Sequence, residues 1–259
     1  MPTSFPFVSH GSASLPATKT GFSVTAAFAG FCALAVQLCS VSAWAQSSCA
    51  SDGQRPPVAL IERFISANCE ACWSDPATLK VKSTELALDW IVPSAKGDDA
   101  PLSAAASSDA LDRLQALNQP AAQGSFNLRR AALPQPLVLR VARGVALGGY
   151  MGASITLSPN RGASLPNHPM TAWLVMIEDI PAGTDGTRVP RQLVRNTLQI
   201  GWNELGAKPA TPALPGQRLH ESRPMSIPSG ANPDRLRVVG WVEDAKGRVI
   251  ASAASVCEK

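Results

Sequence analysis

The sequence predicts an α/β domain followed by an antiparallel region that is rich in β-strands. In the first half, the apolar run 58–64 leads into the polar residues 66–68 and then into two cysteines, Cys69 and Cys72, where a helix is expected to begin. In the second half, short apolar segments alternate with clusters of glycine, proline, asparagine and aspartate, which is the pattern of strands joined by turns. We expect the two regions to meet near residue 145.

The hydrophobic pattern predicts each element of the first region. Residues 58–64 are apolar without strict alternation, which is typical of a strand that is buried on both faces. Ser108 is a suitable N-cap for the second helix, whose apolar residues recur at helical spacing. The further elements expected in this region are a helix at 72–82, a strand at 85–92, a loop at 93–108, a helix at 109–117 and a proline-entered strand at 133–139.

The second region is expected to contain short strands and a terminal hairpin. The residues Asp244-Ala245-Lys246-Gly247 have turn composition and separate two apolar runs, which predicts a β-hairpin. The strands expected here lie at 154–157, 172–177, 193–200, 236–243 and 249–256.

The beginning of the chain resembles a secretory leader. Residues 1–45 contain one lysine and no aspartate, glutamate or arginine, and the apolar stretch 22–41 ends in the small-x-small pattern Ala43-Trp44-Ala45. This arrangement is typical of a signal peptide, and a retained membrane anchor is the alternative. We expect residues 1–45 to be the signal peptide and 46–57 an N-terminal arm. The mature protein would then be periplasmic or secreted, without stable membrane insertion.

Four of the six cysteines follow the expected signal peptide. An even number of cysteines in an exported protein indicates oxidised pairs. We favour the pairs Cys69–Cys72 and Cys49–Cys257, of which the second would join the two ends of the mature chain. The alternative is that the two terminal cysteines, Cys49 and Cys257, stay unpaired.

The composition argues against several classes of partner. The formal net charge of +4 is small, so nucleic acid is not expected as a main partner; Arg129 and Arg130 are expected at the surface. The glycine-rich stretch 144–152 lacks the Lys-Ser/Thr of a phosphate-binding loop. We expect neither a cofactor nor a metal, because only His168 and His220 remain after the leader and both lie near prolines.

The Cys69–Cys72 motif supports four interpretations. In a redox-active dithiol, Cys69 would be the attacking thiolate and Cys72 the resolving thiol. A helix N-terminus would favour the thiolate, while the carboxylate of Glu70 would oppose it. The other interpretations are a structural disulfide at the same place, a metal site, and acid–base or nucleophilic catalysis. The motif alone does not separate the first two.

Residues 62–72 resemble the N-terminal signature E-L-F-T-S-Q-G-C-S-S-C of uncharacterised secreted thioredoxin-like proteins of bacteria, a domain of unknown function. The dipeptide Pro134-Gln135 is similar to the Thr-Pro-Gln of that family, and the segments 193–198 and 249–254 are similar to its tail. The chain departs from the family at 88–93, where it has no histidine. The signature positions that match in register are Glu62, Phe64, Ser66, Cys69 and Cys72.

The resemblance implies a thioredoxin-like fold for residues 58–145, followed by the β-rich region 146–259. It implies an exported protein with a thiol–disulfide site at Cys69 and Cys72 that acts on protein thiols or disulfides, as a thiol–disulfide oxidoreductase does. Pro134 would be the cis-proline beside the disulfide. The alternative is a non-enzymatic secreted binding or structural module on the same scaffold, with a structural disulfide at that position.

Overall fold

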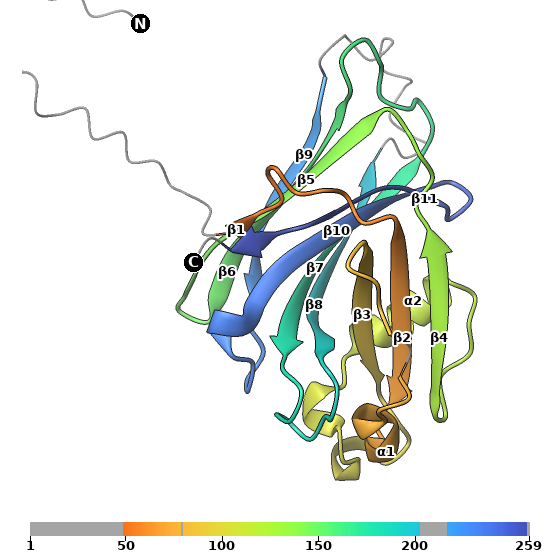
Figure 1. Ribbon diagram of the computed structural model, residues 1–259, viewed down its shortest axis with the longest axis vertical. Helices are drawn as coiled ribbons and strands as arrows, with labels where there is room; N and C mark the ends of the chain where they lie inside the picture. Colours follow the sequence, from red (N-terminus) through yellow and green to blue (C-terminus); the bar gives the residue numbers. More distant parts are fainter. Residues whose placement is uncertain (1–48, 79, 203–216, 258–259) are drawn as a thin grey trace, which may run out of the picture. The chain divides into compact units, whose positions relative to one another are not determined.

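The computed structural model describes residues 49–78, 80–202 and 217–257. The expected signal peptide at 1–45 therefore lies outside the described residues. Figure 1 shows that the described chain forms two β-sheets with short helices around them. The helical elements are α1 (Glu70–Ser74), α2 (Ser108–Ala116), and the 3₁₀ helices η1 (Gly97–Asp99), η2 (Ser103–Ala105) and η3 (Pro233–Arg235).

The larger sheet has seven strands in the order β11-β10-β7-β8-β3-β2-β4. β2 and β3 are parallel neighbours, and β3 joins β8 through a single parallel bridge between Asp89 and Leu193. The remaining neighbours are antiparallel. The strands are β2 (Ala59–Ser66), β3 (Glu85–Val92), β4 (Ser125–Ala131), β7 (Met170–Ile180), β8 (Arg191–Trp202), β10 (Leu236–Asp244) and β11 (Val249–Ala254).

The smaller sheet has five antiparallel strands in the order β12-β1-β5-β6-β9. Gly148 and Gly149 form the two-residue turn between β5 and β6, and both have positive φ. Such a turn favours glycine because its backbone lies in the left-handed region. The strands are β1 (Cys49–Ala50), β5 (Leu137–Leu147), β6 (Tyr150–Pro159), β9 (Leu219–Ser226) and β12 (Val256–Cys257).

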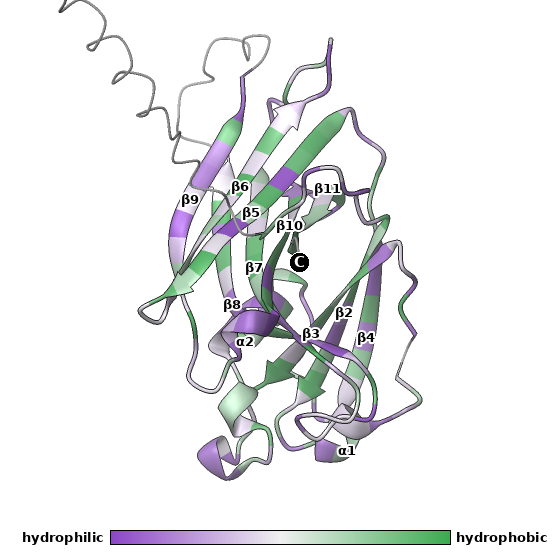
Figure 2. Ribbon diagram, turned by 60° about the vertical axis from the view of Figure 1, so that its left-hand side comes forward, coloured by the Kyte–Doolittle hydropathy of each residue, from purple (hydrophilic) through white to green (hydrophobic). Residues whose placement is uncertain are grey.

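The two sheets pack face to face over a hydrophobic core. Side chains alternate between the two faces of a strand, and in β7 Leu174 and Met176 point into this core while Trp173 and Val175 belong to the core on the opposite face. In Figure 2 the edge strand β9 is mostly hydrophilic, whereas β5 carries hydrophobic stretches. The smaller sheet supplies Leu139, Val141, Met151, Ala153, Ile155 and Leu157 to the core.

The second face of the larger sheet is covered by α2. Ala110 and Leu114 of this helix pack on Leu60, Phe64 and Trp90 of β2 and β3. The side chain of Ser107 accepts a hydrogen bond from the N–H of Asp109 and so caps the helix at the residue before the predicted cap. A third, smaller core lies beneath α1, η1 and η2.

A cluster of buried charges joins α2 to the sheet. Arg113 of α2 is fully buried and donates to Glu62 of β2 at 2.7 Å and to Glu243 of β10 at 2.7 Å. Its guanidinium also lies over the ring of Trp173, 4.5 Å from the centroid. Arg130 of β4 contacts the same two carboxylates. Because a buried charge is costly without a partner, these contacts hold α2, β2, β4 and β10 in one arrangement.

The expectation of an α/β thioredoxin-like fold is wrong. The described residues are 48% strand and 12% helix, and strands from both halves of the chain form the seven-stranded sheet. The helix expected at 72–82 ends at Ser74, because Asp75 precedes Pro76 and takes an extended conformation. The expected boundary at 145 falls inside the β5–β6 hairpin.

Several local predictions are confirmed. The strand at 85–92 has the predicted bounds, and the β10–β11 hairpin forms around the predicted turn. Both predicted disulfides, Cys69–Cys72 and Cys49–Cys257, are present. β4 was not predicted; its residues alternate as they do in an edge strand with one exposed face, but the covered face holds only two large apolar residues, Phe126 and Leu128, beside Arg130.

Gly240 tests the contact between the sheets. A Cβ atom at this position of β10 would lie 2.8 Å from Val141 Cγ1 and 3.0 Å from the carbonyl oxygen of Trp173. We expect Gly240→Ala to lower the free energy of unfolding by roughly 1–3 kcal/mol through overpacking, as measured by urea unfolding. Gly152→Ala in β6 is the matched control, because its Cβ would meet no atom within 4 Å. Equal effects of the two substitutions would contradict the packing described.

Glu243 tests the buried charge cluster. Burial raises the pKa of Glu243, but Arg113 and Arg130 outweigh it and hold the pKa below its ordinary value. A carboxylate with a lowered pKa stabilises the fold above its unfolded pKa, about 4.3, and that stabilisation is lost as the pH falls. We expect Glu243→Gln to cost about 3 kcal/mol at pH 7, with a smaller difference from the parent protein below pH 4.

Unfolding by urea at several pH values measures this difference. Glu221→Gln is the control, because Glu221 pairs with Arg223 at the surface, where ion pairs contribute little. A cost of Glu243→Gln that does not change between pH 7 and pH 3 would contradict the assignment of a charged Glu243.

Candidate functional site

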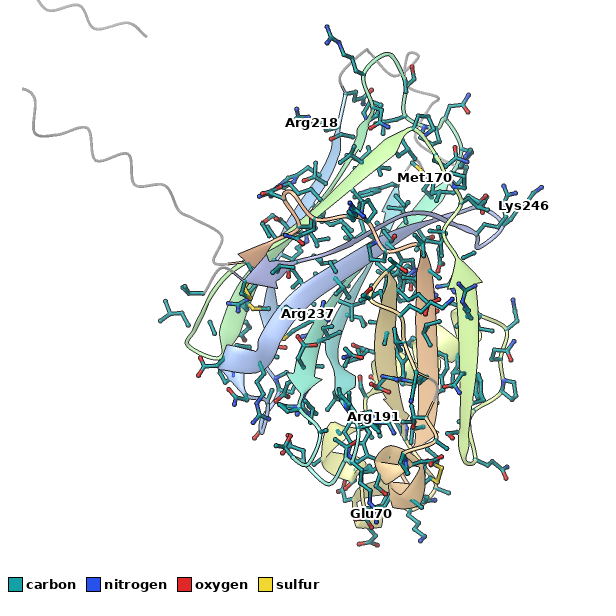
Figure 3. All side chains as sticks on the ribbon, in the orientation of Figure 1. Glu70, Met170, Arg191, Arg218, Arg237 and Lys246 are labelled. Atoms are coloured by element: carbon teal, nitrogen blue, oxygen red, sulfur yellow. A yellow bond between two sulfur atoms is a disulfide. The ribbon has the colours of Figure 1, made fainter. Side chains whose placement is uncertain are left out.

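The Cys69–Cys72 disulfide lies in a surface turn directly after β2. Figure 3 shows this turn at the lower end of the larger sheet, with Glu70 at the tip of the turn. The N–H of Cys72 donates to Cys69 Sγ at 3.3 Å, so Cys69 is the N-cap of α1. Both cysteines are partly exposed, and Asn68, Glu70 and Ala71 around them are exposed. The turn is therefore open to solvent on the side of these three residues.

Trp73 fixes the position of the turn through its side chain. It is 4% exposed and packs in the small core beneath α1. Its Nε1–H donates to the carbonyl oxygen of Asp185 at 2.8 Å, and its own carbonyl oxygen accepts from Thr187 Oγ1 at 3.2 Å. The loop between β7 and β8 therefore holds the residue next to Cys72 in place.

Arg191 of β8 binds the end of the same turn. Its side chain is fully buried, and its Nε and Nη2 donate to the carbonyl oxygen of Trp73 at 3.1 and 2.6 Å. Nη2 also donates to the carbonyl oxygen of Cys72 at 3.0 Å and to Thr78 Oγ1 at 2.9 Å. The last carbonyls of a helix have no partner within the helix, and Arg191 satisfies two of them in α1, those of Cys72 and Trp73.

The charge of Arg191 is shared with a second arginine. Asp89 of β3 is fully buried and accepts from Arg191 Nη1 at 3.3 Å, from Arg63 Nη2, and from the N–H of Gln192 at 2.7 Å. Burial lowers the pKa of Arg191, Asp89 opposes this, and Arg63 adds to it. Two buried guanidinium groups therefore face one buried carboxylate beneath the disulfide turn.

The structure does not bring Pro134 to the cysteine pair. Pro134 is exposed and lies between β4 and β5. It lies near the beginning of β2, because the N–H of Ala132, two residues earlier, donates to the carbonyl oxygen of Val58. The cysteines, in contrast, follow the end of β2. Eight residues of extended strand separate these two places, which is roughly 25 Å.

The sequence interpretation missed the groups that do surround the disulfide. Arg191 and Cys72 are 119 positions apart in the chain, so no local spacing connects them. A buried arginine at the start of a strand is also indistinguishable in sequence from a surface charge. The one signal available was the run Leu193–Leu198, which the resemblance matched to a tail strand and which begins two residues after Arg191.

The two disulfides close loops of very different length. Cys49 and Cys257 are separated by 208 positions and join β1 to β12, whereas Cys69 and Cys72 are separated by three. The loop-closure entropy removed from the unfolded chain corresponds to about 5 kcal/mol for the long loop and about 2 kcal/mol for the short one. The Cys49–Cys257 bond therefore has the larger structural role.

Two features are absent from the part of the chain that the structure describes. This part contains no group of three or more histidine, cysteine, aspartate or glutamate side chains that could hold a metal ion. His168 and His220 are exposed, and His220 Nδ1 contacts Thr156 Oγ1 at 2.8 Å. Within 49–78, 80–202 and 217–257, no helix is long and apolar enough to cross a bilayer. The two disulfides are consistent with an oxidising compartment.

No protein-family model matches the chain. The sequence likewise matches no curated protein. A function must therefore be argued from the site itself, since a fold alone does not determine one.

The unequal loops lead to a stability prediction. We expect the double variant C49A/C257A to lower the free energy of unfolding by about 5 kcal/mol and C69A/C72A by at most about 2 kcal/mol. Urea unfolding of both variants beside the oxidised parent protein measures the difference. Equal losses in the two variants would show that the short loop has a structural role that its length does not predict.

Proposed function

We propose that this is an exported protein, periplasmic or secreted, whose Cys69–Cys72 pair exchanges electrons with thiols or disulfides of other proteins. The even set of paired cysteines supports an oxidising compartment. The resemblance of residues 62–72 to the signature of secreted bacterial proteins supports the same location. The partner would be a protein with an accessible thiol or disulfide.

One observation carries this proposal: the turn is fixed in place by contacts other than its own disulfide. Arg191 and Thr187 bind the carbonyl oxygen of Trp73, and the indole of Trp73 is buried and hydrogen-bonded to Asp185. A partly exposed disulfide on an independently anchored turn can open and close without unfolding its surroundings. A disulfide that was required to hold the turn in place could not open without disturbing the structure around it.

The exchange follows the usual two steps. In the reduced protein, the thiolate of Cys69 attacks one sulfur of a partner disulfide, forms a mixed disulfide and releases the other partner sulfur as a thiolate. The thiolate of Cys72 then attacks Cys69 Sγ, which closes the Cys69–Cys72 bond and releases the second partner thiolate. The partner gains two electrons and this protein loses two; with a partner dithiol, the same steps run in reverse.

A structural disulfide in a secreted binding or structural module is the second candidate. The observation that favours it is the shortness of α1, which has five residues instead of the eleven expected. So short a helix provides little of the dipole that stabilises a thiolate at a helix N-terminus. Glu70, which is exposed beside both cysteines, also disfavours a thiolate, although solvent screens it.

Trapping of a mixed disulfide tests the proposal. We expect reduced Cys72→Ser protein, in which Cys69 has no resolving partner, to form a covalent adduct with insulin, whereas Cys69→Ser forms much less. We also expect the reduced parent protein to reduce insulin faster than free dithiothreitol does. Mass spectrometry and insulin turbidity measure the two outcomes.

The contrary outcome is equally specific. A parent protein that reduces no insulin, a Cys72→Ser variant that forms no adduct, and a reduction potential below about −300 mV would together establish the structural disulfide. The Cys49–Cys257 bond is an internal reference, because Cys49 is 2% exposed and should stay oxidised under the mild reduction that opens Cys69–Cys72.

A further inference from the structure

Arg191 contacts the backbone of a cysteine in the exchanging pair. Its Nη2 lies 3.0 Å from the carbonyl oxygen of Cys72, and the guanidinium lies over the ring of Trp73, 5.1 Å from the centroid. Four hydrogen bonds from Nε and Nη2 to the turn fix the position of the charge. The distance between this cation and the two sulfur atoms is therefore set by the fold.

The buried charges beneath the turn do not cancel. Arg63, Asp89 and Arg191 are all nearly inaccessible to solvent, and two guanidinium groups against one carboxylate leave one positive charge in excess. Charges interact more strongly in the protein interior than at the surface, where water and salt screen them. The excess positive charge therefore acts on the cysteines more strongly than an exposed charge at the same distance.

The remaining charged groups near the turn are exposed or already paired. Glu70 and Asp75 lie on the turn itself and are exposed; Asp75 also interacts with Arg191 and opposes the lowering of its pKa. Asp185, in the loop between β7 and β8, is exposed and pairs with Arg235 at 3.1 Å. Arg195, further along β8, pairs with Glu178 at 2.6 Å. The buried excess is therefore the charge near the disulfide that water and salt screen least.

We propose that Arg191 is a positioning residue that makes the Cys69–Cys72 pair more oxidising, by placing a buried positive charge beside the reduced cysteines. Opening the disulfide creates a thiolate, and a fixed cation stabilises that anion but not the neutral disulfide. Stabilising the reduced form raises the reduction potential of the pair. The proposal rests on the proposed exchange function, and it assigns to a side chain the role that the helix N-terminus was expected to have.

Two substitutions that change the buried charge in opposite directions test this proposal. We expect Arg191→Gln to shift the equilibrium with glutathione about tenfold toward the disulfide, which corresponds to a potential about 30 mV lower. Asp89→Asn, which removes the shared carboxylate, should shift the equilibrium in the opposite direction. Arg191→Lys keeps the charge and should restore most of the parent value. Arg140→Gln removes an arginine that pairs with Asp52, and should have no effect.

The pH dependence of alkylation gives an independent measure. In the reduced pair, with Cys49–Cys257 intact, we expect the thiol pKa of Cys69 to rise by about one unit in Arg191→Gln and to fall in Asp89→Asn. Asp75→Asn should lower it slightly, because this exposed carboxylate is screened. Since the hydrogen bond from Ala77 N–H to Asp75 Oδ1 can persist in asparagine, this third variant measures how strongly an exposed charge on the turn shifts the same pKa, for comparison with the buried one.

The outcomes separate this proposal from the proposed function. Shifts of opposite sign in Arg191→Gln and Asp89→Asn support the role of Arg191, even if the parent protein reduces no insulin, in which case only the exchange function fails. Shifts of the same sign in these two folded variants would show that Arg191 acts only by holding the turn, and would overturn the proposal. If neither buried variant folds, a Cys69 thiol pKa in the reduced parent protein at or above the free value of about 8.5 would overturn it as well.

Discussion

The fold depends on the burial of two adjacent and opposite charges in β2. Glu62 and Arg63 are 0% and 3% exposed, and successive residues of a strand point to opposite faces. The two charges must therefore find their partners on opposite faces of the sheet: Glu62 binds Arg113 of α2, and Arg63 binds Asp89 of the neighbouring strand β3. A shift of β2 by one residue would exchange the two faces and leave both charges without partners, so this pair fixes the register of the central strands.

The two faces connect this constraint to different parts of the molecule. On the helix face, Arg113 extends from Glu62 to Glu243 of β10, so the antiparallel half of the sheet is tied to the parallel pair β2–β3. On the other face, Asp89 extends from Arg63 to Arg191 of β8, and Arg191 reaches the carbonyl oxygen of Cys72. The same requirement that fixes the strand register therefore also determines where the disulfide turn lies and which charge lies beneath it.

Local features of this fold were predictable from the sequence, whereas its long-range pairings were not. The strand at 85–92 and the β10–β11 hairpin follow from apolar runs and turn residues that lie within a few positions of one another. The prediction of an α/β fold was wrong because it treated two strands and the C-x-x-C between them as part of an α/β layer with a long helix. Pro76 instead ends the helix that begins at the C-x-x-C after one turn. Arg129 and Arg130 were both expected at the surface, yet Arg130 turns inward to Glu62 and Glu243. For the site, the cysteine pairings followed from number and spacing, but Arg191, Asp185 and Thr187 come from a segment more than 100 positions away, as their contacts with Trp73 show.

The two disulfides differ in how much they constrain the chain. Cys49–Cys257 joins the first and last described strands, and its 208-residue separation gives it most of the stabilisation that cross-linking can provide. Cys69–Cys72 constrains almost no chain, and the turn that carries it is already held by Trp73 and Arg191. A disulfide that contributes little to stability can be opened at little cost to the fold. The short loop and the anchored turn therefore limit what this pair contributes to the fold, and the exchange proposed for it would use these same two features.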